Sequence, residues 1–323
     1  MIGHYKTFTG ALALLLMASI FTGCVSEGQK EYEEGVDLYE AEQYESAVQQ
    51  FVMAADLGHA RAQYELGACY FFGKGVEKDE KEAVKWYRRA AEQGDAAAQT
   101  NLGICYENGY GTEKDEKEAV KWYRKAAEQG IAEAQTNLGF CFLNGVGVEQ
   151  NAEEAVKWYR KAAEQGIAEV QFNLGLCYYA GQGVEQDYAE AVKWFRKAAD
   201  QGLAEAQTNL GFCFLNGVGV EQNAEEAVKW YRKAAEQGLA GAQFFLGTCY
   251  NDGKGVEQDD AEAVKWFRKA AKQGIAMAQH NLGACYHNGK GVEQDDAEAA
   301  KWYRKAAEQG LESAKEALKN LDN

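Results

Sequence analysis

Apolar residues recur at helical spacing along most of this chain, and the whole pattern returns every 36 residues from Ala60 to Leu311. Each copy contains two stretches with apolar residues three or four positions apart, which in the first copy include Leu66 and Trp86. This spacing is typical of amphipathic helices, and a strict period of this length indicates stacked copies of one two-helix unit. The sequence therefore predicts an all-α fold, a right-handed α/α superhelical solenoid of seven helix-turn-helix repeats with helical end caps.

The ends of the two helices are also marked in the sequence. Asp79 precedes Glu82 by three positions, which is a capping-box-like pair at the start of the second helix, and every later copy has Asp or Asn in the first place and Glu in the second. Gly73 follows the first helix and Gly94 follows the second, where a glycine can adopt the left-handed conformation that ends a helix. The chain contains no proline, so we expect glycine to end every helix.

The repeated motif resembles the Sel-one-like repeat (SLR), a 36-residue relative of the tetratricopeptide repeat. The resemblance covers residues 60–311 and rests on positions that recur seven times, which in the first copy are Leu66-Gly67, Tyr70, Gly73-x-Gly75-Val76, Ala83, Trp86-Tyr87 and Ala90-Ala91. It implies a non-catalytic scaffold or adaptor for protein–protein interaction. Residues 24–59 resemble a tetratricopeptide-like hairpin and are expected to form an acidic N-terminal cap, and residues 312–323 a C-terminal capping helix.

The first 23 residues have the pattern of a lipoprotein-type signal peptide. An apolar run from Ala11 to Phe21 leads to Gly23 and Cys24 and is too short to span a bilayer, which takes about 20 residues. The stretch from Phe21 to Cys24 resembles a bacterial lipoprotein box, which implies lipidation of Cys24. We therefore expect an exported protein, anchored in the membrane only through this lipid and facing the periplasm or the cell surface. The alternative is an ordinary cleaved signal peptide with an incidental cysteine.

The charge of the chain argues against nucleic-acid binding. The formal net charge is −16, and residues 27–58 contribute nine acids against Lys30. A surface this acidic repels phosphate backbones, and no basic stripe with interleaved aromatic residues occurs.

Each repeat carries one cysteine at the same position, from Cys69 to Cys285. Equivalent residues of stacked repeats lie about 8–10 Å apart, whereas a disulfide requires Cα atoms within about 7 Å. No CxxC motif or neighbouring histidine suggests a metal site. We therefore expect seven free thiols that serve as small buried apolar side chains between helices.

Catalysis finds little support in the sequence. None of the four serines begins a Ser-x-x-Lys motif, and His280 and His287 lie two helical turns apart, about 10 Å, which is too far for one metal ion. We expect no catalytic residue, no metal and no cofactor. The alternative is an envelope enzyme that acts on peptidoglycan or β-lactams, which the resemblance to cysteine-rich SLR proteins suggests.

The positions that vary between copies predict a binding surface. If Leu66, Cys69 and Tyr70 face the second helix of the repeat, then positions 64, 68 and 71 share another face, which we expect to line the concave side of the solenoid and to bind a protein or peptide partner. The alternative is that these side chains pack between successive first helices. The predicted groove residues are Tyr64, Phe71, Phe140, Leu143, Phe172, Leu176, Tyr179, Phe212, Leu215 and Phe244.

Two parts of the array are identical. Residues 132–166 and 204–238 share all 35 positions, two repeats apart, so the chain presents Phe140 and Phe212 in the same local setting. This duplication favours an extended or repetitive partner that contacts several weak sites. The sequence leaves the oligomeric state open.

Overall fold

The structure is a computed structural model that describes residues 28–321. The predicted signal peptide and Cys24 lie outside the described residues. The described part contains 17 α-helices and no strand, which confirms the all-α fold. None of these helices is both long enough and apolar enough to cross a membrane.

Each repeat consists of a first helix, called helix A, and a second helix, called helix B. The chain begins with α1 (Gln29–Glu40) and α2 (Tyr44–Asp56) and ends with α17 (Glu312–Leu321). The A helices of repeats 1 to 7 are α3 (Ala60–Phe72), α5 (Ala96–Asn108), α7 (Ala132–Asn144), α9 (Ala168–Ala180), α11 (Ala204–Asn216), α13 (Ala240–Asp252) and α15 (Ala276–Asn288). The B helices are α4 (Glu80–Glu92), α6 (Glu116–Glu128), α8 (Ala152–Glu164), α10 (Tyr188–Asp200), α12 (Ala224–Glu236), α14 (Asp260–Lys272) and α16 (Asp296–Glu308).

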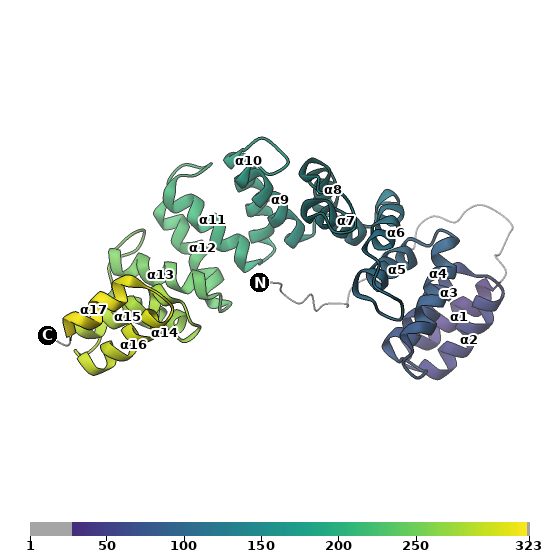
Figure 1. Cartoon of the computed structure of the whole chain (residues 1–323), viewed down its shortest axis with the longest axis horizontal. Helices are drawn as coiled ribbons and strands as arrows, with labels where there is room; N and C mark the ends of the chain where they lie inside the picture. The colour runs from purple at the N-terminus through teal and green to yellow at the C-terminus, as the bar shows by residue number, and fades with distance from the viewer. Residues whose placement is uncertain (1–27, 322–323) are drawn as a thin grey trace.

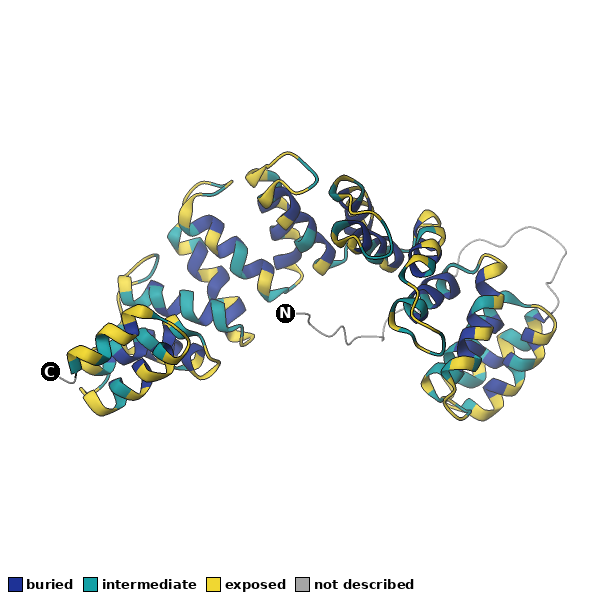
Figure 2. Ribbon diagram, viewed as in Figure 1, coloured by how far each residue is buried: buried dark blue, intermediate teal, exposed yellow. Residues whose placement is uncertain are grey.

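The helices stack in chain order along an elongated, curved path (Figure 1). Every helix packs against the helix before it and the helix after it. Buried residues follow this path between the helices, and exposed residues concentrate on the loops and the outer helix faces (Figure 2). The molecule is therefore an α-solenoid without a single central core.

The predicted helix boundaries are confirmed within the repeats, whereas α1 departs from the expectation, because it is followed by Ala41 and by Glu42 with φ of 60° and not by a glycine. The Asp79 carboxylate accepts hydrogen bonds from the backbone N–H groups of Lys81 and Glu82, which would otherwise lack partners in the first turn of α4. Helix A of the same repeat ends at Gly73 with φ of 68°, and helix B is followed by Gly94 with φ of 97°. Both glycines thus adopt the left-handed conformation that the sequence predicted.

Two further glycines set the distances between helices. A methyl group at Gly139 in α7 would lie 2.7 Å from ring carbons of Tyr159, so the aromatic ring of helix B packs directly on the backbone of helix A. A methyl group at Gly147, in the loop of repeat 3, would lie 2.1 Å from the carbonyl oxygen of Glu116 in repeat 2. The first contact fixes the spacing within a repeat, and the second fixes the spacing between repeats.

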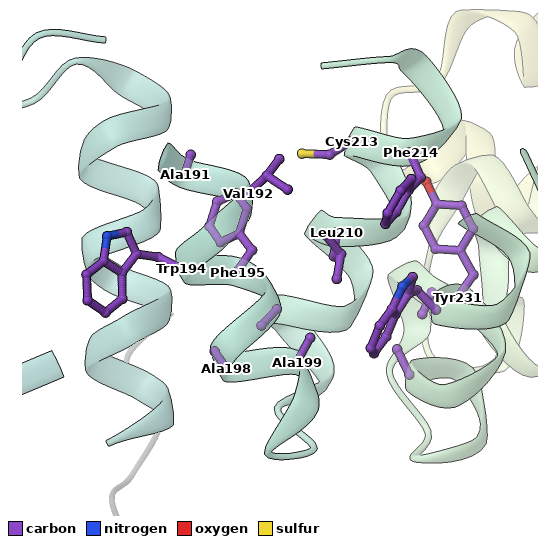
Figure 3. Packing of buried hydrophobic residues seen from close by; sticks show 14 of the residues in the cluster. Ala191, Val192, Trp194, Phe195, Ala198, Ala199, Leu210, Cys213, Phe214 and Tyr231 are labelled. Carbon is purple, nitrogen blue, oxygen red and sulfur yellow. The ribbon is translucent and has the colours of Figure 1, made fainter. Parts of the chain in front are cut away.

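The apolar core is shared between neighbouring repeats. Around α10 and α11, the cluster includes Val192 of repeat 4, Leu210 and Cys213 of helix A of repeat 5, and Trp230 of its helix B. Cys213 and Val192 point toward each other across the α10–α11 interface (Figure 3). Leu66 and Cys69 likewise pack in a cluster with residues of α2, the helix that precedes their own repeat. Each interface between repeats therefore buries part of the core, so one repeat cannot bury its apolar surface alone.

A ladder of glutamine pairs, each with one buried and one more exposed member, joins successive repeats. Gln135 donates to the carbonyl oxygen of Ala127 in the preceding helix B at 3.1 Å, and its own amide oxygen accepts from Gln165 at 2.9 Å. Gln165 also donates to the carbonyl oxygen of Gly130 in the preceding repeat at 2.9 Å. The same glutamine pair recurs in all seven repeats. These bonds satisfy polar groups that would be costly to bury unpaired.

The cysteines of the repeats are free and buried, as the sequence predicted. Each is at most 5% exposed. Burial raises the pKa of the thiols, to about 12 for Cys69 and to about 11 for Cys213. The thiols are therefore protonated at neutral pH, and they act as small apolar groups.

A matched pair of substitutions tests the glycine contact between repeats. Gly147→Ala and Gly166→Ala both place a side chain at positive φ, but no heavy atom lies within 4 Å of a methyl group at Gly166. We expect Gly166→Ala to lower the free energy of unfolding by about 1–2 kcal/mol and Gly147→Ala by about 3 kcal/mol or more, because the latter also displaces the preceding repeat. Urea unfolding followed by circular dichroism measures both values. Equal losses would show that the contact at Gly147 does not set the spacing.

Thiol reactivity tests the burial of the cysteines. At pH 8, an alkylating reagent should leave the seven repeat cysteines unmodified in the native protein and modify all seven after denaturation without a reductant, because buried protonated thiols are poor nucleophiles. Peptide mapping by mass spectrometry identifies each modified residue. Three or more disulfides among these residues would contradict the structure.

Candidate functional site

The residues predicted at positions 64 and 71 lie half-buried against helix B of their own repeat. Phe172 and Tyr179 pack on the ring of Phe195, with ring centroids 5.6 and 6.3 Å apart. Tyr64 and Phe71 pack on Tyr87 in the same way. Phe244 packs on Phe267, and Leu143 and Leu215 contact the neighbouring core clusters. These seven side chains are thus partly used for packing, but they pack on helix B of their own repeat and on the core clusters and not between successive A helices, which was the alternative that the sequence left open.

The residues at position 68 are the exposed members of the predicted groove. Phe140 is 47% exposed, Leu176 38% and Phe212 37%. They occupy the same place on helix A of repeats 3, 4 and 5. Their binding role stays a prediction, and they are the predicted groove residues that offer the most apolar surface to a partner.

Two polar positions that the sequence analysis did not single out share this face. In repeat 3, Glu133 and Asn137 precede Phe140 by seven and three residues, which places all three on one side of α7. The signal in the sequence was a glutamate, an asparagine and a large apolar residue at spacings of four and then three residues, which occurs in repeats 3, 4 and 5. We call the resulting surface the central helix-A face, and it consists of Glu133, Asn137, Phe140, Glu169, Asn173, Leu176, Glu205, Asn209 and Phe212.

The surroundings of Glu133 affect its carboxyl group. Glu133 is exposed to solvent, yet desolvation by the surrounding protein raises the pKa of its carboxyl group. Burial also raises the pKa of Tyr64 to about 12, and the negative charge of Glu133 contributes to that shift from two repeats away.

Repeat 1 carries a cluster in which opposite charges are paired, and a small pocket lies near it in the chain. Arg61 forms an ion pair with Glu65 at 3.1 Å and lies over the ring of Tyr64 at 4.3 Å. An apolar pocket of about 40 Å³ lies between repeats 1 and 2. Its lining residues are Phe71, Phe72, Tyr87, Asn101, Ile104 and Cys105.

The face changes in character after repeat 5. Phe245 stands where repeats 2 to 5 have asparagine, and it stacks on Tyr231 with ring centroids 5.2 Å apart. The buried hydroxyl of Tyr231 has no hydrogen-bond partner among the described residues. In repeat 7, His280 packs on Tyr303 and His287 contacts Asp296 at 2.6 Å. The central helix-A face is therefore limited to repeats 3 to 5.

The described residues contain no group of His, Cys, Asp and Glu that could hold a metal ion. The larger depression, of about 810 Å³, lies between loops of repeats 2 and 3. Among its polar residues, Asp115 caps α6 and Lys114 pairs with Glu116 at 2.8 Å. His59 is likewise occupied, since it accepts a hydrogen bond from the backbone N–H of Ala62.

Comparison with known proteins agrees with the repeat geometry. The model of the Sel1 repeat matches seven consecutive segments, at 60–95, 96–131, 132–167, 168–203, 204–239, 240–275 and 276–311. The chain is similar to the crystal structure of a Sel1 repeat protein from Oxalobacter formigenes, with 35% identity, a TM-score of 0.70, and coverage of 92% of this chain and 87% of that one. It is also similar to c5321, described as a protective antigen present in uropathogenic Escherichia coli strains displaying an SLR fold, with 34% identity, a TM-score of 0.62, and coverage of 91% and 79%.

A comparison with curated proteins finds none that matches this chain. The seven matched segments make up more than half of its residues, and their boundaries coincide with the repeats seen in the structure. The chain therefore belongs to the Sel1 repeat family.

Proposed function

We propose that this protein is a non-catalytic scaffold or adaptor in the bacterial cell envelope that binds a partner protein or peptide along its helix-A surface. Sel1 repeat proteins are tetratricopeptide-like scaffolds that generally mediate protein–protein interaction. The observation that carries the proposal is the exposure of Phe140, Leu176 and Phe212 at one position of three consecutive repeats. A row of exposed apolar side chains costs solubility unless a partner covers it.

The proposal includes export and anchoring through a lipid on Cys24. Its support is the sequence from Ala11 to Cys24, which has the order of an apolar run, small residues and a cysteine. The two relatives of known structure described above come from bacteria, where such anchoring is available.

We further propose that the helices outside the repeats cap the two ends of the stack. At the N-terminal end, α2 packs on α3 through Phe51 and Leu66, while Glu33, Glu34 and Asp37 of α1 are exposed. At the other end, α17 packs on α16 through the buried Ala314. A terminal unit with one apolar and one polar face keeps a solenoid from exposing its last core interface.

Crosslinking tests the binding surface. A photoreactive amino acid in place of Asn137 should crosslink a partner in native cells. The combined change Phe140→Ser, Leu176→Ser and Phe212→Ser should abolish that crosslink, because the partner loses its apolar contacts. The control is Met53→Ser with Leu57→Ser, which removes two exposed apolar residues outside the repeats. Unchanged crosslinking by a triple variant with a native circular dichroism spectrum would refute the assignment.

A turnover assay with a chromogenic β-lactam separates the scaffold from the enzymatic alternative. Because no serine in the chain begins a Ser-x-x-Lys motif, we expect no hydrolysis above the buffer rate. Clear hydrolysis that follows the purified protein through a final chromatographic step would favour an envelope enzyme that acts on β-lactams.

A further inference from the structure

Repeats 3, 4 and 5 present the same three kinds of side chain on the central helix-A face. Each has a glutamate, then an asparagine four residues later, then a large apolar residue three residues after that. In repeat 3 these are Glu133, Asn137 and Phe140. No other repeat has this combination, since the residues at the first position are Arg61, Ala97, Gly241 and Met277. A surface that repeats its chemistry at regular intervals suits a ligand that does the same.

The three glutamates of this face lack cationic partners. Within residues 28–321, neither Glu133, Glu169 nor Glu205 forms an ion pair. The B helices differ, because the glutamate near the start of each one pairs with a lysine three residues later, as Glu154 does with Lys157 at 2.6 Å. The glutamate near the start of each helix B is thus paired locally, whereas the three glutamates of the central helix-A face are available to a ligand.

The distances between the glutamates and the apolar side chains indicate which shape of ligand would fit this face. Glu133 and Phe140 are seven residues apart on α7, a rise of about 10 Å, so the carboxylates and the apolar side chains form two parallel rows. Equivalent positions in neighbouring repeats are about 8–10 Å apart. An extended chain advances about 3.3 Å per residue, so about three ligand residues match one repeat. Between the two rows, the asparagine amides carry both a donor and an acceptor, as the backbone of an extended peptide requires.

We infer that the central helix-A face binds an extended, cationic segment of a partner protein, in which a basic residue and an apolar residue recur about every three positions. The basic residues contact Glu133, Glu169 and Glu205, and the apolar residues contact Phe140, Leu176 and Phe212. This inference rests on the proposed scaffold function and adds the chemistry of the partner. The identity of repeats 3 and 5 means that the same short motif fits at both ends of the site.

A synthetic peptide of five Lys-Ser-Leu units tests the inference with the full chain, by fluorescence anisotropy. We expect it to bind, and we expect the affinity to fall as salt rises, because salt screens exposed charges. A peptide of five Glu-Ser-Leu units should not bind measurably. Absence of binding by the lysine peptide, or equal affinity for the two peptides, would overturn the inference.

A matched pair of triple variants locates the site. The combination Glu133→Gln, Glu169→Gln and Glu205→Gln should weaken binding of the lysine peptide about tenfold, as expected for the loss of three solvent-accessible ion pairs. The control combines Glu128→Gln, Glu164→Gln and Glu236→Gln, which removes the same net charge from exposed positions at the ends of B helices and should change the affinity less than twofold. Equal losses in the two variants would overturn the inference, since binding would then follow net charge alone.

The crosslink at position 137 separates this inference from the scaffold function. We expect the variant with Glu133→Gln, Glu169→Gln and Glu205→Gln to reduce the crosslink to the native partner. The control variant with Glu128→Gln, Glu164→Gln and Glu236→Gln should retain it. The crosslink could be lost with the Phe140, Leu176 and Phe212 changes but retained when the three glutamates become glutamine. That result would leave the scaffold function standing and overturn the inference about charge.

Discussion

The close approach of backbones at glycine is the constraint on which the rest of this structure depends. At Gly139 the ring of Tyr159 occupies the space of a side chain, and at Gly147 the carbonyl of the preceding repeat does so. Because both contacts recur in every repeat, each two-helix unit has one internal geometry and one way to meet its neighbour. Small differences in either contact would accumulate along seven units, so a regular solenoid requires glycine at both positions.

The glutamine ladder and the shared core make this array cooperative. The ladder joins each repeat to the preceding one through buried hydrogen bonds, and the apolar clusters include residues of both repeats. The stability of such an array depends on interfaces between neighbours more than on any single unit. Both helices contribute to these contacts, since Leu210 and Cys213 lie on helix A and Trp230 lies on helix B.

Helix A is consequently free to vary on the side that neither neighbour covers. One of its faces packs on helix B of the same repeat, another on helix B of the preceding repeat, and the third faces solvent. In repeats 3 to 5 this third face combines a carboxylate, an amide and an apolar side chain. Because packing does not constrain this side of helix A, a chain with a strict period can still present a localised surface with its own chemistry.

The sequence by itself determined the period, the two helices of each repeat, their caps and the burial of the cysteines, because these depend on spacing along the chain and on local backbone chemistry. Phe172 and Phe140 show what it did not determine. Both were predicted to face the groove, but Phe172 packs on Phe195 and Phe140 is exposed. A helix in a solenoid contacts two different B helices, so its exposed side depends on the angles at both interfaces. Those angles follow from how the repeats pack, and only the tertiary structure decided which of positions 64, 68 and 71 remains open to a partner.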